Sequence, residues 1–144
     1  MIDVLVFDPL VHTLVAAMNS TFRRITLAAG LLGLTGVALG AFGAHALKDT
    51  LAARGTLPIW QTAVLYQLVH SVALLALAGW RDALGASLTR IALCWVAGIV
   101  LFSGSLYWLA LGGPGFLGPI TPLGGLAFLA GWALVAWSAF HRPE

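Results

Sequence analysis

The sequence predicts an all-α protein: an integral membrane bundle of four transmembrane helices joined by short loops. Of its 144 residues, 60% are hydrophobic and only 8% are charged, whereas a soluble domain carries about 25% charged residues. The mean hydropathy is +0.98. Three long intervals hold no charged side chain: Arg24 to Lys48, Arg54 to Arg81 and Arg90 to Arg142. Because so few charges could not cover an apolar core in water, the natural solvent of this surface is lipid.

The length of each interval decides how many spans it holds, because a helix rises 1.5 Å per residue and needs about 20 residues to cross the hydrocarbon. The first two intervals hold one span each, and Pro58 suits the first turn of the second span. The third interval is twice as long and is broken by the turn-rich segment 112–119, GGPGFLGP. Thr121 and Pro122 then resemble an N-cap followed by proline. The predicted spans are about residues 25–44, 59–79, 91–111 and 121–140.

The segment before the first span, residues 1–17, is apolar but is interrupted by two aspartates and a proline. It is too short to cross a membrane and lacks the basic start of a signal peptide. We interpret it as an N-terminal extension, either an over-called start preceding Met18 or an interfacial tail, and residues 18–144 as one transmembrane domain. A cleavable signal ending at residues 44–46 is the alternative for the first span, but the apolar run exceeds the roughly 7 to 15 residues of a signal.

The basic residues predict the orientation. Five would lie on one side of the membrane and two on the other: Arg23, Arg24, Arg81, Arg90 and Arg142 against Lys48 and Arg54. Cytoplasmic loops carry the excess of lysine and arginine. We therefore expect both termini in the cytoplasm.

Composition also excludes several classes of protein. The net charge of +2 arises without any lysine- or arginine-rich run, so no nucleic-acid partner is expected. Cys94 is the sole cysteine, so neither an internal disulfide nor a thiolate metal cluster can form.

Glycines recur along one face of the first span. They are Gly33, Gly36, Gly40 and Gly43. A row of small residues allows another helix backbone to approach closely. We interpret the row as a packing surface within the bundle, with a dimer interface as the alternative.

Polar side chains are placed within the second and third spans. Gln67 and His70 are three residues apart on one helical face, and Ser105 and Tyr107 of the third span could meet them. We expect His70 to be buried and hydrogen-bonded to a partner in the third span. Such a cluster either stabilises the helix bundle through interhelical hydrogen bonds or forms a path for protons or ions. The anchors at the membrane interface are expected among the larger aromatic residues Trp80, Tyr107, Trp108, Trp132 and Trp137.

Evidence for catalysis is weak. No carboxylate lies in any predicted span, so Ser105 lacks the acid and base that a serine nucleophile needs. His45 and Asp49 are four residues apart in the first loop, where a short helix would rest on the membrane surface with Leu47 and Leu51. We expect an exposed pair there, with a metal or substrate contact as the alternative. No catalytic, cofactor or metal site is predicted.

Four ordered motifs after Met18 carry a resemblance. They are GAFGAHAL at residues 40–47, WQTA at 60–63 continuing to Tyr66, Gln67 and His70, LFSGSLY at 101–107, and PITPLGG at 119–125 with Gly131 and Trp132. In these motifs the chain resembles the small bacterial membrane proteins typified by YgdD and YwdK, classed as domain of unknown function 423 and related to vertebrate transmembrane protein 256. Ala46 replaces an expected glycine, and residues 1–17 have no counterpart. The resemblance implies a multi-pass protein of the bacterial cytoplasmic (inner) membrane without an established activity.

These observations favour a non-enzymatic structural or accessory membrane protein that acts through helix packing, in contact with the lipid bilayer and with a homo-oligomer or another membrane protein as the possible partner. Two rivals remain. One is a small oligomeric transporter or channel with a polar path near Gln67 and His70. The other is a membrane enzyme or a quinone- or lipid-binding module that works through His45 and Asp49.

Overall fold

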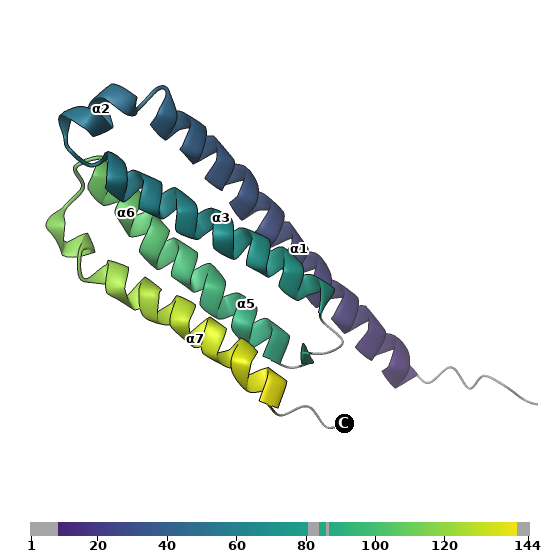
Figure 1. Ribbon diagram of the computed structural model, residues 1–144. Coiled ribbons are helices and arrows are strands. Elements are labelled where there is room, and N and C mark those ends of the chain that lie inside the picture. The colour runs from purple at the N-terminus through teal and green to yellow at the C-terminus, as the bar shows by residue number, and fades with distance from the viewer. Residues whose placement is uncertain (1–8, 81–83, 86, 141–144) are drawn as a thin grey trace, which may run out of the picture.

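The computed structural model describes residues 9–80, 84–85 and 87–140, and these residues form helices and turns without a strand (Figure 1). The elements are α1 (Pro9–Ala44), α2 (Lys48–Ala53), α3 (Leu57–Gly79), α5 (Ser87–Gly98), the π-helix η1 (Ile99–Ser103), α6 (Gly104–Ala110), the 3-10 turn η2 (Gly115–Leu117) and α7 (Ile120–Phe140). Four stretches are long and apolar enough to cross a membrane: Ser20–Ala44, Leu57–Gly79, Ser87–Ala110 and Gly115–Phe140. The all-α, four-span fold predicted from composition is confirmed.

The first helix starts earlier than the sequence predicts. Its backbone runs as one helix from Pro9 to Ala44, so residues 9–17 extend the helix of the first span, whose membrane-spanning stretch is Ser20–Ala44. These first turns project beyond the ends of the other helices (Figure 1). Residues 1–8 lie outside the described part of the chain.

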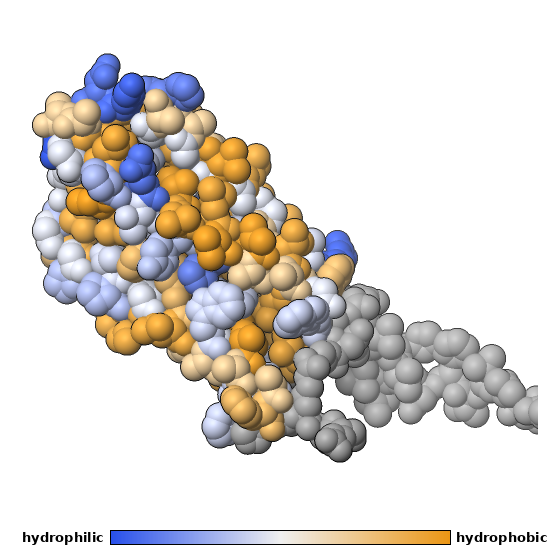
Figure 2. Space-filling view, viewed as in Figure 1, coloured by the Kyte–Doolittle hydropathy of each residue, from blue (hydrophilic) through white to orange (hydrophobic). Residues whose placement is uncertain are grey.

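The four spans lie side by side in the order α1, α3, α5 with α6, and α7 (Figure 1). Helix α1 packs almost entirely on α3, and α7 packs on α5 and η1. The main core is built around Leu74, Ile91, Trp95 and Phe128. Outward-facing residues such as Leu27, Val72 and Leu129 are more than half exposed, as lipid-facing side chains would be. Figure 2 shows hydrophobic residues over much of the flank and hydrophilic residues gathered at the α2 end.

The third span is interrupted by η1. The Gly104 amide donates to the Ile99 carbonyl five residues back, which is the hydrogen-bond pattern of a π-helix. Ser103 is fully buried there, and its hydroxyl has no hydrogen-bond partner among the residues that the structure describes. Apolar periodicity does not reveal such a one-residue insertion, so the sequence predicts a continuous helix over this region.

The described basic residues separate to the two ends of the bundle. Arg23, Arg24 and Arg90 lie at one end, and Lys48 and Arg54 lie at the other. Arg81 and Arg142 lie outside the described residues.

The short helix α2 closes the end of the bundle where the sequence placed a helix resting on the membrane surface. Leu51 is completely buried and packs in a small core with Trp60 and Ala110. The hydroxyl of Thr56 then donates to the Ala110 carbonyl over 2.8 Å, which joins the first loop to the end of α6. This prediction is therefore wrong for Leu51, because the apolar face of α2 meets protein.

The glycine-proline break falls where it was predicted. Helix α6 ends at Ala110, Gly112 adopts a positive φ of 89°, and α7 begins at Ile120. Thr121 is inside the first turn and is not an N-cap. Its hydroxyl is shared with Ser105 of α6 over 2.7 Å, so it joins two spans.

Candidate functional site

Gln67 connects three of the four spans. Its side chain lies on the inner face of α3 and is 4% exposed. The amide nitrogen donates to the Leu32 carbonyl over 2.8 Å and to the Thr35 hydroxyl over 2.9 Å, both in α1. The amide oxygen accepts a 3.0 Å hydrogen bond from the Tyr107 hydroxyl of α6. The amide nitrogen and the amide oxygen of this side chain both therefore bond to other helices.

The Thr35 hydroxyl completes this network. It donates to the Leu31 carbonyl of its own helix over 2.9 Å and so can accept from Gln67. Tyr107 is held by an edge contact with the Trp60 ring, at a centroid distance of 4.8 Å. Trp60 in turn donates from Nε1 to the Leu39 carbonyl over 2.9 Å. Helices α1, α3 and α6 are thus joined by side chains that fix one another.

His70 is buried, at 4% exposure, and has a partner on each ring nitrogen. Nδ1 lies 2.8 Å from the Tyr66 carbonyl, which can only accept, and Nε2 lies 3.2 Å from the indole Nε1 of Trp132, which can only donate. These roles assign the neutral tautomer with the proton on Nδ1. The ring also stacks on Phe128 at 3.7 Å between centroids and 17° between planes.

The position of His70 corrects one prediction. Its hydrogen-bond partner was expected in the third span, but Trp132 belongs to α7, the fourth span. Trp132 was expected among the interface anchors, yet its indole nitrogen points into the bundle. The pairing depends on how α7 is rotated about its axis, which periodicity does not reveal.

Ser105 does not join Gln67 and His70. It is buried at 5% exposure, donates to the Phe102 carbonyl over 2.9 Å and shares its other hydrogen bond with Thr121. The four residues predicted as one cluster therefore divide into three groups, of which only Gln67 and Tyr107 touch. The sequence missed Thr35, Thr121 and Trp132 as partners. Each of these three residues carries a polar group within an otherwise apolar span, and this feature could have identified them as partners.

The glycine row of α1 faces α3. A methyl group at Gly36 would lie 2.8 Å from the Leu68 Cδ2 atom, and one at Gly43 would collide with the Trp60 indole. Gly40 faces Val64, and Gly33 is nearest to Ser71. The row therefore packs within the chain, and the close approach brings the α1 carbonyls within reach of Gln67 and Trp60.

His45 and Asp49 are both exposed. Within the described residues, no hydrogen bond or ion pair joins them, and no group of three or more potential metal-ligating residues occurs.

Four surface grooves of about 780, 270, 300 and 250 Å³ are lined by described residues. Gln67, His70 and Tyr107 line none of these four, whereas Ser105 lines the last. Gln67, His70 and Tyr107 thus bond to other groups of the protein away from these four grooves.

Four apolar helices, lipid-compatible outer faces and polar groups paired inside define a multi-pass membrane protein of the helical-bundle class. A family model described as "Protein of unknown function (DUF423)" matches residues 39–125. The chain belongs to this family. The matched region includes Gln67, His70 and Tyr107, whereas Thr35 and Trp132 lie outside it.

Relatives of this chain are membrane proteins whose function is uncharacterised. It is 43% identical to the UPF0382 membrane protein YwdK of Bacillus subtilis over 108 residues, covering 74% of this chain and 87% of the relative. It is 44% identical to a UPF0382 membrane protein of Haemophilus influenzae over 124 residues, covering 85% and 97%. It is 42% identical to the UPF0382 inner membrane protein YgdD of Escherichia coli K12 over 129 residues, covering 84% and 92%. No solved structure matches the chain.

Proposed function

We propose that this protein is a structural or accessory component of a bacterial cytoplasmic membrane, acting through helix packing without catalysis or transport. The observation that carries the proposal is the set of hydrogen bonds that joins the Gln67 side chain to α1 and α6. A polar side chain that pairs fully inside a bundle contributes about 0.6 to 2 kcal/mol to helix association. Its partners are then the lipid bilayer and, through its outer faces, a second copy or another membrane protein.

The arrangement disfavours a polar path through the bundle. A proton or ion path needs groups that can exchange partners along a hydrated route. Here Gln67 is held by Leu32, Thr35 and Tyr107, and both ring nitrogens of His70 face fixed partners. Trp132 donates but cannot accept a hydrogen bond, so a proton could not pass onward from His70 through its indole nitrogen.

An enzymatic role has little support at His45 and Asp49. The first loop and the glycine-proline loop do adjoin, through the hydrogen bond from Thr56 to the Ala110 carbonyl. However, His45 and Asp49 are exposed and do not line any of the four grooves. His45 lies in the turn after α1 and Asp49 lies in α2, and no bond between them is found in the described part of the chain. The two side chains therefore lack the positioning that catalysis requires.

We also propose that both termini lie in the cytoplasm. The support is the excess of arginine at the end that holds Arg23, Arg24 and Arg90, set against Lys48 and Arg54. Carboxyl-terminal fusions to a fluorescent protein and to alkaline phosphatase should give fluorescence and no phosphatase activity. The reverse pattern would contradict this orientation.

The proposed function is tested by combining a flux assay with stability measurements. Purified protein in proteoliposomes should pass no more protons than empty liposomes under an imposed pH gradient. Gln67→Leu and His70→Phe should each lower the unfolding temperature in detergent, while Gln61→Leu, on the exposed side of α3, should not. Native proton flux that disappears in variants of unchanged stability would overturn the structural role and identify a transport protein.

A further inference from the structure

We propose that the end of the bundle at Arg23 and Arg24 binds an anionic phospholipid, with its phosphate at the Arg24 guanidinium group, the positive charge of Arg23 nearby on the same helix, and its acyl chains in the grooves beside Arg24. This site lies at the opposite end from His45 and Asp49. It is independent of the hydrogen-bond network at Gln67.

The charge at this end is uncompensated by the described residues. Arg23 and Arg24 are adjacent and exposed, and neither has a hydrogen-bond or ion-pair partner in the described part of the chain. Asp49 is the one acidic residue in the described part of the chain, and it lies in α2 at the opposite end of the bundle. Arginine presents several donors in a planar fork that suits phosphate oxygens, and basic pockets between membrane helices on the cytoplasmic side bind anionic lipid head groups.

A groove between helices leads from Arg24 into the membrane. It has a volume of about 270 Å³ and is lined by α1, α3 and α5. Thr21, Arg24 and Thr89 provide its polar lining. The remaining lining is apolar: Ile25, Ala28, Leu74, Ala92, Leu93 and Val96. The polar lining lies at the Arg24 end of the groove, and the apolar lining continues along the span. This order matches the head group of a lipid followed by its acyl chain.

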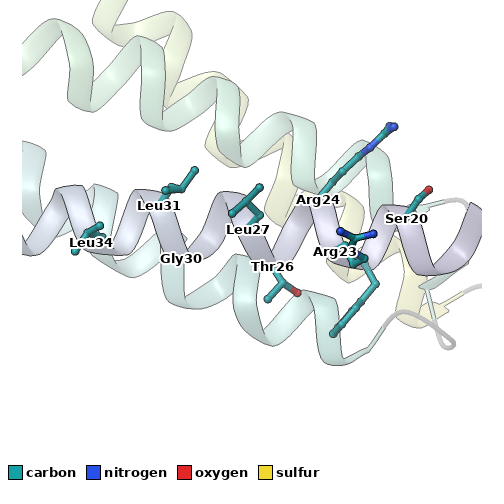
Figure 3. Close-up of a pocket in the computed structure, with 9 residues that line it drawn as sticks. Ser20, Arg23, Arg24, Thr26, Leu27, Gly30, Leu31 and Leu34 are labelled. Atoms are coloured by element: carbon teal, nitrogen blue, oxygen red, sulfur yellow. The ribbon is translucent and has the colours of Figure 1, made fainter.

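A second groove runs along the neighbouring face of α1. It has a volume of about 780 Å³, and Ser20, Arg23 and Arg24 line its polar part, while Leu27, Leu31 and Leu34 continue along the helix. Figure 3 shows Arg24 extending from α1 away from Arg23, and the three leucines spaced along the same helix. Arg24 lines both grooves. One phosphate at this position therefore has a hydrophobic surface on each side, as the two chains of a phospholipid require.

Two other occupants fit less well. A soluble phosphate would use the arginines but not the apolar lining. A second copy in a two-fold arrangement parallel to the first would bring its own Arg23 and Arg24 to the same end, because such a contact uses the same patch on both chains. Like charges placed together repel each other, so charge complementarity favours a lipid.

The test is native mass spectrometry of the purified chain with dioleoyl phosphatidylglycerol and dioleoyl phosphatidylcholine, which share acyl chains and differ in head-group charge. We expect the anionic lipid to be retained more strongly. Each basic side chain near an anionic lipid surface contributes about a fivefold gain, so Arg23→Gln with Arg24→Gln should weaken retention roughly thirtyfold. The matched control, Lys48→Gln with Arg54→Gln, removes the same charge from the other end and should leave retention unchanged.

The apolar part is tested separately. Ala28→Phe fills the groove between α1 and α5 with both arginines intact, and should weaken retention without lowering the unfolding temperature. Equal retention of the two lipids, or an equal loss in the control variant, would overturn the site. Displacement of the lipid by inorganic phosphate would indicate a phosphate site, and a dimer that excludes lipid would show that a second copy occupies the face; either outcome would also overturn the proposal.

Discussion

The Tyr107 hydroxyl of α6 donates a 3.0 Å hydrogen bond to Oε1 of Gln67 in α3, while the Gln67 amide nitrogen reaches α1. One glutamine thereby fixes the relative positions of three membrane-spanning segments. In hydrocarbon, the alternative to such a bond is a polar group with no partner, which is unfavourable.

Gln67→Leu should lower the free energy of unfolding by about 2 kcal/mol, because it removes three hydrogen bonds and strands the Tyr107 hydroxyl. Steric trapping or thermal unfolding in detergent measures the change. Gln61→Leu is the matched control, since Gln61 is an exposed glutamine of the same helix. Similar losses in both variants would show that the network at Gln67 has no special role.

Tyr107→Phe removes one hydroxyl and preserves the aromatic contact with Trp60. We expect a loss of about 1 kcal/mol. Because the bond joins Tyr107 to Gln67, the double variant Gln67→Leu with Tyr107→Phe should cost less than the sum of the single changes. Additive losses would mean that the two side chains are not energetically coupled.

His70 should carry its proton on Nδ1 and accept from Trp132 on Nε2. Nitrogen NMR of protein labelled at histidine should show one protonated and one unprotonated ring nitrogen in that arrangement. Trp132→Phe should shift the Nε2 resonance, because it removes the indole donor. Trp80→Phe, at an exposed position, is the control. A mixture of tautomers in the native protein would contradict the fixed pairing.

Gly124→Ala should lower the free energy of unfolding by about 1 to 3 kcal/mol through overpacking. The new methyl group would lie 2.8 Å from the Phe102 Cα atom and would collide with its backbone nitrogen. Backbone of the third span cannot move aside as a flexible side chain can. Gly30→Ala is the control, since among the described residues nothing beyond the neighbouring backbone of α1 lies within 4 Å of the added methyl. If Gly124→Ala lowered the free energy of unfolding no more than Gly30→Ala does, α7 would not approach η1 this closely.

Much of the fold could be predicted from particular residues. Charged side chains bound the apolar intervals, and residues 112–119 divide the longest interval at the place where α6 ends and α7 begins. The glycine spacing in α1 identified the face that meets α3. The start of α1 and the π-helix could not be predicted, since helix ends and single-residue insertions leave little trace in apolar periodicity.

The sequence by itself determined that the chain crosses a membrane four times and that Gln67 and His70 share a face of the second span. Both follow from local rules: the hydrocarbon thickness sets the span length, and 3.6 residues per turn set the face. Only the tertiary structure decided that Gln67 pairs with Tyr107, that His70 pairs with Trp132 and that Ser105 pairs with Thr121. Those pairings depend on the rotation and axial position of separate helices, which are set by close packing at residues such as Gly36, Gly98 and Gly124.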